Sequence, residues 1–266
     1  MDFLLECIGF PPDYPLGELV ERARREGEPA AWRGDPDRHR RIALGGGLEV
    51  RVDRDRGQRG WNVLPYYQVP QRLRVAVDEI RHLPDSPFDA LLVGWAAPPV
   101  GEGGPARGAY RLSAFVTDAR RLPLRLPPRH VLALSLACFA LDVTYSGPDE
   151  PAARERASGG TLLATQDGPC IVPLGGPGDP GGAADLSLSV LEVRHLENPI
   201  TREPVDVVLA DAPERPLALF ASRWQLARDG LPAPRPGWRI EGTFLFSGRI
   251  AGGLPGPSRT VRGPFG

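Results

Sequence analysis

Two stretches of this sequence repeat each other 113 residues apart. Residues 73–83 read LRVAVDEIRHL and residues 186–196 read LSLSVLEVRHL, so six of these 11 positions are identical. An internal repeat constrains the fold strongly, because each copy has to be the same kind of structural unit. We therefore predict two tandem copies of one module, at residues 44–147 and 158–253.

Further matches occur in the same order along both copies. They are PFDALL at 87–92 with PVDVVL at 204–209, VLP at 63–65 with IVP at 171–173, and the alternating apolar runs that follow Pro128 and Pro236. The gaps between the matches fall at Gly and Pro positions, where loops tolerate insertions. Chance explains a single match more easily than a series, so the series supports a duplication.

Apolar side chains alternate through Leu73, Val75 and Val77, and the second copy has the same alternation. A period of two is typical of a half-buried strand. In both copies the phase then slips by one residue, before Ile80 in the first and before Val193 in the second. Such a slip turns the apolar set to the wrong face unless the strand contains a bulge. We therefore predict a β-bulge at the same place in each copy.

The rest of each copy is also rich in predicted strands. They are 88–96, 110–116 and 131–143, the hairpins 48–53 with 61–66 and 161–165 with 170–174, and a short helical turn near 118–122 or 222–229. Five or six strands in about 100 residues are typical of a small barrel such as the OB-fold. The predicted fold is therefore mainly β, with two tandem, internally duplicated OB-like β-barrel domains. A flatter two-layer sandwich is the alternative.

The segments outside the two copies have a different character. Residues 1–43 contain an apolar stripe that stops at Gly27, which predicts a short N-terminal helix at 15–25, followed by a charged linker. Residues 148–157 are rich in Pro and charge and are expected to link the two copies. The tail at 254–266 is so rich in Gly and Pro that we expect disorder there.

Charge and composition exclude several functions. All 32 residues of the Lys and Arg class are Arg, 33 residues are acidic, and the formal net charge is −1. This balance excludes a strongly basic nucleic-acid coat and an acidic disordered tail. Because the chain has no Lys, it cannot use a Schiff-base lysine or the lysine of a phosphate-binding loop.

The cysteines and the apolar runs bear on location. Cys7, Cys138 and Cys170 are an odd number at wide spacing, so we predict buried, reduced thiols and no metal site. The first residues carry acids where a signal peptide needs positive charge. The longest apolar run, 131–141, is shorter than the roughly 20 residues of a membrane-spanning helix. We expect a cytoplasmic protein without a membrane partner.

The most specific polar pattern is a Glu-x-Arg-His motif in both copies. Its residues are Glu79, Arg81 and His82 in the first copy and Glu192, Arg194 and His195 in the second. Glu and Arg two residues apart share one face of a strand and lie close enough to contact each other. One hypothesis is a pair of equivalent anion- or carboxylate-binding patches with a titrating His. The other is a solvated strand face that both copies retain from their ancestor.

A second recurring pattern is an Asp at the start of a predicted strand, Asp89 in one copy and Asp206 in the other. A buried carboxylate is costly unless it is paired, so the Arg of the preceding strand is one candidate partner for each. Capping of the turn that follows a Pro is the other interpretation.

Binding of single-stranded nucleic acid is one alternative function. Small barrels bind such strands through aromatic platforms in a basic groove. The candidate residues for this role are Trp61 and Arg56, together with Arg51, Arg54 and Arg59. The acids of the same region offset much of the charge that strong phosphate binding requires.

A hydrolase is the second alternative. It requires His82 or His195 in a pocket with a carboxylate. No Ser lies in a GxSxG elbow, and no Gly-rich segment has the strand before it and the helix after it that a phosphate-binding loop needs.

The hypothesis that fits best is a non-enzymatic binding or scaffold protein. It depends on the lack of a recognisable catalytic set and on two similar modules with long Gly- and Pro-rich loops, such as residues 100–109. We expect the partner to be another protein, docked by the edges or loops of the modules, with no cofactor and no metal ion.

Overall fold

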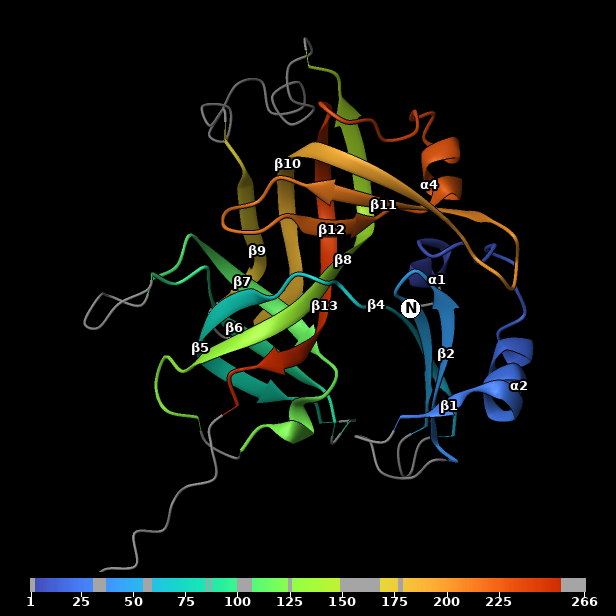
Figure 1. The fold of residues 1–266 in the computed structure, drawn as a ribbon, viewed down its shortest axis with the longest axis horizontal. Helices are drawn as coiled ribbons and strands as arrows, with labels where there is room; N and C mark the ends of the chain where they lie inside the picture. Colours follow the sequence, from blue (N-terminus) through green and yellow to red (C-terminus); the bar gives the residue numbers. More distant parts are fainter. Residues whose placement is uncertain are drawn as a thin grey trace, which may run out of the picture.

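The computed structural model describes residues 3–30, 37–54, 59–84, 86, 88–99, 107–123, 126–148, 168–176 and 179–254. Strands make up 53% and helices 12% of it, so the predicted mainly β class is confirmed. The strands form one four-stranded and one nine-stranded sheet (Figure 1). The predicted linker at 148–157 and the tail at 254–266 lie almost entirely outside the described residues.

The N-terminal part of the chain forms the four-stranded sheet. Across the sheet, the strands are β1 (Glu28–Pro29), β2 (His39–Gly45), β3 (Leu48–Asp53) and β4 (Asn62–Tyr67). The predicted hairpin of β3 with β4 is confirmed. Residues 39–41, which we predicted as linker, belong to β2, and the predicted division between 43 and 44 falls inside this strand.

Two helices precede this sheet, α1 (Phe3–Glu6) and α2 (Leu16–Glu26). The predicted helix corresponds to α2, which buries the apolar stripe of Leu19, Val20 and Ala23 on the side that packs against β2. It ends at Gly27, whose N–H donates a hydrogen bond to the carbonyl of Ala23 at 2.8 Å.

The nine-stranded sheet contains strands from both predicted copies. Its strands are β5 (Leu73–His82), β6 (Ala90–Ala96), β7 (Tyr110–Val116), β8 (Val131–Ser146), β9 (Cys170–Gly176), β10 (Asp179–Glu197), β11 (Pro204–Ala210), β12 (Leu217–Phe220) and β13 (Arg239–Gly252). Their order is β11-β12-β8-β5-β6-β7-β13-β10-β9, with additional pairings of β11 with β10 and of β8 with β13. The helical turns predicted at 118–122 and 222–229 are both present, as η2 (Ala119–Arg121) and α4 (Arg223–Arg228).

Strands β5–β8 and β10–β13 follow one pairing scheme, and we call them the first set and the second set. In the first set β5 pairs with β6 and β8, and β6 pairs with β7. In the second set β10 pairs with β11 and β13, and β11 pairs with β12. Between the sets, β8 is parallel to β12, β7 is parallel to β13, and β8 is antiparallel to β13. Each of these pairings therefore has a counterpart in the other set.

The registers of the two sets correspond as well. Leu73 lies opposite Leu134, while Leu186, 113 residues after Leu73, lies opposite Gly242, 108 residues after Leu134. The constant offset of 108 between β8 and β13 is the one at which Pro128 matches Pro236 in the sequence. We conclude that equivalent strands are also aligned residue by residue.

The long strands β8 and β13 lie side by side at the junction of the two sets (Figure 1). Cys138 of β8 lies directly opposite Phe246 of β13, and these residues are themselves 108 positions apart. Corresponding positions that face each other indicate a two-fold relation between the sets. The same relation matches Phe115 of β7 with Phe220 of β12, because they lie opposite corresponding residues of β13 and β8.

Both predicted β-bulges are present. The register between β5 and β6 shifts between Val77 and Glu79, and the register between β10 and β11 shifts between Val190 and Glu192. The extra residue in the second set, Leu191, is 49% exposed. The phase slip in the sequence therefore arises because one residue in each long strand has no partner across the ladder.

The match of residues 63–65 with 171–173 does not correspond to equivalent structure. The first segment lies in β4 of the small sheet, whereas the second lies in β9, which pairs with β10 at the edge of the large sheet. The predicted hairpin partner of β9, at 161–165, lies outside the described residues. A match of three residues is too short to specify which strand a segment pairs with.

The predicted equivalence of Asp89 and Asp206 is wrong by one position. His82 lies opposite Ala90, whereas His195 lies opposite Asp206. Asp206 therefore corresponds to Ala90, and the loop before β11 is longer by three residues, not by the four that matching the letters implied.

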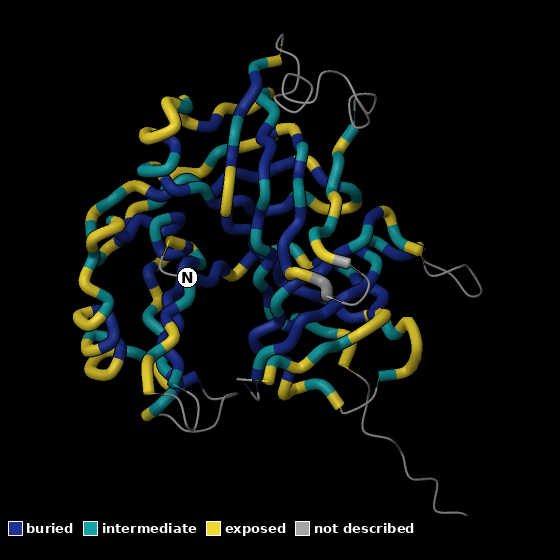
Figure 2. The backbone as a smooth tube through the Cα atoms, turned by 180° about the vertical axis from the view of Figure 1, so that it is seen from behind, coloured by how far each residue is buried: buried dark blue, intermediate teal, exposed yellow. Residues whose placement is uncertain are grey.

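Figure 2 shows where buried residues lie along the backbone. Their apolar side chains form two clusters. The first belongs to the nine-stranded sheet and includes Leu186 and Phe244. The second lies where the N-terminal segment and the small sheet meet the large sheet, and it includes Leu5, Val50 and Phe220. That the sets are two OB-like barrels of common origin stays a prediction.

Candidate functional site

The repeated Glu-x-Arg-His motif lies on exposed strand faces in both sets. Arg81 is 2.9 Å from Glu79, and Arg194 is 2.8 Å from Glu192, with the four side chains 36–51% exposed. A hydrogen bond from Arg194 lowers the pKa of the Glu192 carboxyl. The predicted Glu–Arg contact is formed in each set, while an anion-binding role for these residues stays a prediction.

His82 and His195 are both exposed. The Nδ1 atom of His195 lies 2.7 Å from Oδ1 of Asp206, and 78% of the His195 side chain is exposed. Asp206 thus contacts a His on the neighbouring strand and not the predicted Arg194. The hydrolase hypothesis requires an enclosed imidazole, and neither ring is enclosed.

Of the described residues of the nucleic-acid hypothesis, Arg51 is buried and Arg54 lies over the ring of Trp61. Arg51 is only 1% exposed, so its guanidinium cannot reach a phosphate in solution. Trp61 is half-buried, and Cζ of Arg54 lies 4.6 Å from the centre of its ring. Arg56 lies outside the described residues.

A pocket of about 340 Å³ lies between the two sheets, and we call it the inter-sheet pocket. Its apolar wall consists of Leu4, Leu64, Pro65, Leu83, Pro84, Phe115, Phe139 and Leu245. Its polar groups come from Asn62, Ser86, Asp89, Thr117 and Ser247. An apolar cavity with a few polar groups at the junction of two layers is the usual form of a ligand-binding site.

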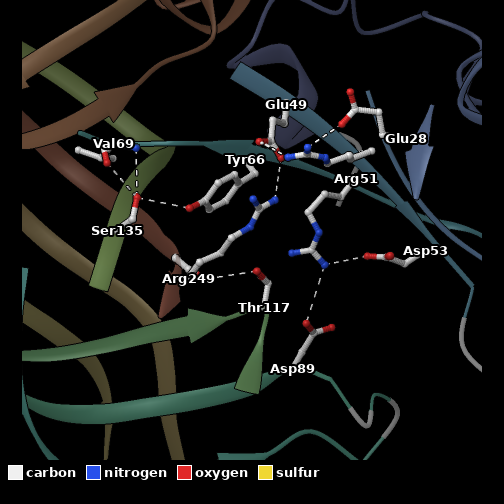
Figure 3. A network of polar contacts seen from close by, with 12 residues as sticks. Glu28, Glu49, Arg51, Asp53, Tyr66, Val69, Asp89, Thr117, Ser135 and Arg249 are labelled. Carbon is white, nitrogen blue, oxygen red and sulfur yellow. Dashed lines mark hydrogen bonds and ion pairs between the residues drawn. The ribbon is translucent and has the colours of Figure 1, made fainter. Parts of the chain in front are cut away.

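Asp89, which lines the pocket, belongs to a group of charged side chains that are largely buried (Figure 3). Nη2 of Arg51 is 2.7 Å from Oδ2 of Asp53 and 3.9 Å from Oδ1 of Asp89. Nδ1 of His39 lies 3.0 Å from the other oxygen of Asp53. The side chains of His39, Arg51 and Asp53 are each at most 3% exposed. This group therefore connects β2 and β3 to the start of β6.

Electrostatics keep Arg51 charged in this position. Burial lowers the pKa of its guanidinium, but Asp53, Asp89 and Asp118 raise it, and the net pKa is raised. Nε of Arg51 is buried and has no hydrogen-bond partner among the described residues. One guanidinium between the carboxylates of Asp53 and Asp89 leaves these three side chains with a formal charge of −1 beside the pocket.

A second group of charges joins the small sheet to the large one (Figure 3). Glu49 of β3 accepts hydrogen bonds from Arg249 of β13 at 2.7 Å and from Arg41 of β2 at 3.3 Å. Cζ of Arg249 lies 3.7 Å from the centre of the Tyr66 ring, and the Tyr66 hydroxyl donates to Ser135 of β8 at 3.3 Å. Burial raises the pKa of Tyr66 although Arg249 acts to lower it. Polar contacts thus hold this side of the small sheet in place.

Phe115 and its counterpart in the second set, Phe220, differ in burial. Phe115 lines the pocket and is half-buried, whereas its counterpart Phe220 is 0% exposed. The ring of Phe220 lies 5.0 Å from that of Tyr67 and 5.2 Å from that of Phe139. The same scaffold position is therefore open in one set and filled in the other.

The N-terminal segment packs against the second set, where Glu6, Cys7 and Val205 line another pocket of about 390 Å³. Ser222, which corresponds to Thr117 of the pocket, donates a hydrogen bond to the Glu6 carboxylate at 2.9 Å. Asn198 Nδ2 donates to the carbonyl of Ile8 at 2.9 Å. The apolar side chains of residues 4–10 join the same buried cluster as Phe220.

The thiols are structural in this arrangement. Cys7 and Cys138 are buried, Cys170 is half-buried, and all three are free. Burial raises the pKa of the Cys7 thiol to about 12, and its Sγ donates to the carbonyl of Ala140 at 3.8 Å. A thiol with such a pKa stays protonated and is a poor nucleophile at neutral pH.

Sequence patterns missed the charged group behind the pocket. Glu49, Arg51 and Asp53 alternate with apolar residues in β3, a pattern that predicts a solvated polar face. All six residues of β3 are buried, because its other face meets charges from β6 and β13. The available signal was the order of Glu49, Arg51 and Asp53 along one strand face, because neighbouring side chains of opposite charge can pair with each other.

The described part of the chain holds no group of three or more His, Cys, Asp or Glu side chains that could bind a metal ion. Within those same ranges, no helix has the length and apolar character needed to cross a membrane.

No protein-family model, no curated protein and no solved structure matches this chain. Its function is therefore inferred from its own residues.

Proposed function

We propose that this chain is a non-enzymatic binding protein that docks a short segment of a partner protein in the inter-sheet pocket. The observation that carries the proposal is the difference between the two sets. Residues 4–10 of this chain join the buried cluster that contains Phe220, while the corresponding Phe115 lines a pocket with a volume of about 340 Å³. Since the second set holds an apolar segment of the chain, we expect the corresponding site of the first set to hold an apolar segment of a partner.

We propose further that the two sets descend from one duplicated OB-like module. The matched pairings, the shared registers and the bulge in each long strand support a common origin. In this proposal both copies inherited a groove for a covering segment. The N-terminal segment took one groove, and the other was left for a partner.

Differences at corresponding positions define what the open groove accepts. Asp89 stands where the second set has Val205, and Ser247 of β13 stands where β8 has Phe139. The formal charge of −1 behind the pocket favours a cation beside Asp89. A Lys or Arg side chain combines an apolar stem with a charged end. We therefore propose a partner segment with apolar side chains and one Lys or Arg.

The two alternative functions have less support. A hydrolase has no enclosed histidine at the repeated motif, since His82 and His195 are exposed. A nucleic-acid surface at Trp61 loses Arg51 to the buried charge group. The docking proposal, in contrast, uses the pocket and the charges that stand behind it.

Selection from a peptide-display library tests the proposal. Selected peptides are measured by fluorescence anisotropy against the native chain and three variants. Ser247→Phe places in the pocket the side chain found at the corresponding position of β8, and Asp89→Asn removes the charge. Asp211→Asn, at an exposed position in the second set, is the matched charge control. Circular dichroism and thermal unfolding confirm that each variant is folded, and Ser247→Leu replaces the Phe variant if that one is not.

We expect selected peptides to carry a basic residue among apolar ones. Their affinity should fall by about tenfold or more with Ser247→Phe, because the pocket is filled, and by several-fold with Asp89→Asn, because an ion pair at the pocket wall is lost. Asp211→Asn should leave it unchanged. Peptides that bind the Ser247→Phe and native forms equally, or a library that yields no binder, would overturn the proposal.

A further inference from the structure

We propose a second binding site, for a compact polyphosphate, in a groove between the end of α2 and the strands β2 and β3. The groove has a volume of about 680 Å³, and five of its seven lining residues are Arg. We call it the basic groove. It shares no lining residue with the inter-sheet pocket, so this site is independent of the docking proposal.

Two walls present the arginines toward the groove. Arg24 and Arg25 belong to the last turn of α2, while Arg38, Arg40 and Arg54 come from the start of β2 and the end of β3. Nη1 of Arg40 donates to the carbonyl of the residue that ends α2 at 3.0 Å, and the N–H of Arg54 donates to the carbonyl of Arg38 at 2.9 Å. The first contact joins the two walls, and the second holds β2 and β3 together within one wall.

The groove carries an excess of positive charge. Among the described residues of its lining, Glu21 and Asp37 are acidic, so the formal charge of these residues is five minus two, or +3, while Glu26 lies 2.8 Å from Arg25 beside them. Arg24 is 2.9 Å from Glu21, and Arg40 is 3.6 Å from Asp37. Ion pairs at exposed positions are weak, because water and salt screen them. A multiply charged anion can therefore replace them.

Phosphate is the anion that suits this set of cations. The planar guanidinium group makes paired hydrogen bonds to two phosphate oxygens at once. The chain contains no Lys, so every cation of the groove is of this type. Several phosphates linked in a row match the +3 charge and can reach both walls.

The structure favours a compact ligand over a nucleic-acid strand. A single strand needs exposed aromatic faces for its bases in addition to a basic groove. Arg54 lies over the ring of half-buried Trp61 and covers that aromatic face. The net charge of −1 also gives the whole chain no extended positive field for a long polyanion. A polyphosphate requires neither feature.

Isothermal titration calorimetry at low salt tests this site with three probes, sodium tripolyphosphate, sodium sulfate and a short oligothymidylate. The groove variants are Arg24→Gln with Arg25→Gln on one wall, and Arg38→Gln on the other. The matched control is Arg202→Gln with Arg228→Gln, which removes the same charge at side chains that are 79% and 73% exposed elsewhere. Thermal unfolding shows that each variant is folded.

We expect tripolyphosphate to bind more tightly than sulfate and to lose about tenfold or more in affinity in either groove variant, because phosphate contacts are lost. The control should bind as the native chain does. No binding by the native chain, or an equal loss in the control, would overturn the site. Tighter, groove-dependent binding of the oligothymidylate would overturn the compact ligand and assign the groove to a nucleic-acid strand.

Discussion

The two sets of strands share one scaffold, but different segments cover them. On the second set, residues 4–10 contact Asn198 and Ser222, and their apolar side chains join the buried cluster that contains Phe220. The small sheet contacts the first set through Arg51 with Asp89 and the second set through Glu49 with Arg249, and it leaves a pocket open beside Phe115. Corresponding strands therefore do not imply corresponding chemistry. Strand pairing determines which residues of the two sets are equivalent, whereas the segment packed over each set determines what those residues contact.

The two coverings also differ in energetics. Apolar burial stabilises in proportion to area, by about 25 cal/mol per Å². Buried charges lose their hydration, and only close, well-oriented partners offset that loss. Arg51 has such partners at Asp53 and Asp89, yet an apolar group of equal size is often as stable. The charged group therefore makes more sense as part of a binding site than as a device for stability.

The largest difference between the sets is expected at Phe220 and Phe115. Phe220 is fully buried, so Phe220→Ala should lower the free energy of unfolding by about 3–5 kcal/mol. Phe115 is half-buried at the pocket, so Phe115→Ala should cost less than half as much, because part of the ring is already in contact with water. Urea denaturation measures both values. Equal losses would show that the two grooves are packed alike.

Arg51→Met tests the buried charge group of Arg51, Asp53 and Asp89. The substitution leaves Asp53 and Asp89 without their shared cation and should lower the free energy of unfolding by about 3 kcal/mol. The double variant Arg51→Met with Asp53→Leu should regain about 1 kcal/mol or more, because it removes one of the two carboxylates that faced the guanidinium. A double variant less stable than the single one, in the same urea experiment, would contradict this view of the charged group.

Alkaline pH should lower the free energy of unfolding, in part through the titration of Cys7 in the N-terminal segment. Burial raises the pKa of Cys7 from 9.0 to about 12, so the folded state holds this proton more tightly than the unfolded state. The resulting stability is fully present below pH 9 and is lost as the pH rises toward 12, with a loss of about 2 kcal/mol by about pH 10.5. Burial also raises the pKa of Tyr66, so its titration adds to the loss of stability only above about pH 10, the ordinary pKa of a tyrosine.

Urea denaturation over a range of alkaline pH values measures this loss. Cys7→Ala should make the decline in stability above pH 9 shallower, and part of the decline should remain because burial also raises the pKa of the Cys138 thiol. A native chain and a Cys7→Ala variant with the same decline would mean that the thiol does not titrate in this range.

Local patterns predicted the elements whose causes are local. The phase slip between Val77 and Ile80 predicted the bulge, because an unpaired residue changes the alternation of its own strand. The apolar stripe before Gly27 predicted α2 for a similar reason. The repeat predicted that residues around Leu73 and Leu186 are equivalent, and their registers agree.

Contacts between distant segments were not predictable in this way. Arg51 reads as a surface residue in its own strand, and it is buried because Asp89, 38 positions later, lies against it. Residues 4–10 are too short for any periodic pattern, yet their apolar side chains join the buried cluster that contains Phe220. The inter-sheet pocket exists only because β4, β7 and β13 converge on one place. Such a site depends on tertiary packing, which alternation within one strand cannot report.

The smallest effects are expected at the repeated Glu–Arg pairs, where the two sets are most alike. Arg81→Gln and Arg194→Gln each remove one exposed ion pair, so both should leave the urea midpoint unchanged at physiological salt. Arg194 lowers the pKa of Glu192, so any contribution is present above the ordinary carboxyl pKa of 4.5 and is lost as the pH falls below it. A loss of stability in one set alone would show that the two motifs have acquired different roles. The two sets would then differ in energetics at the motif where their sequences are most similar.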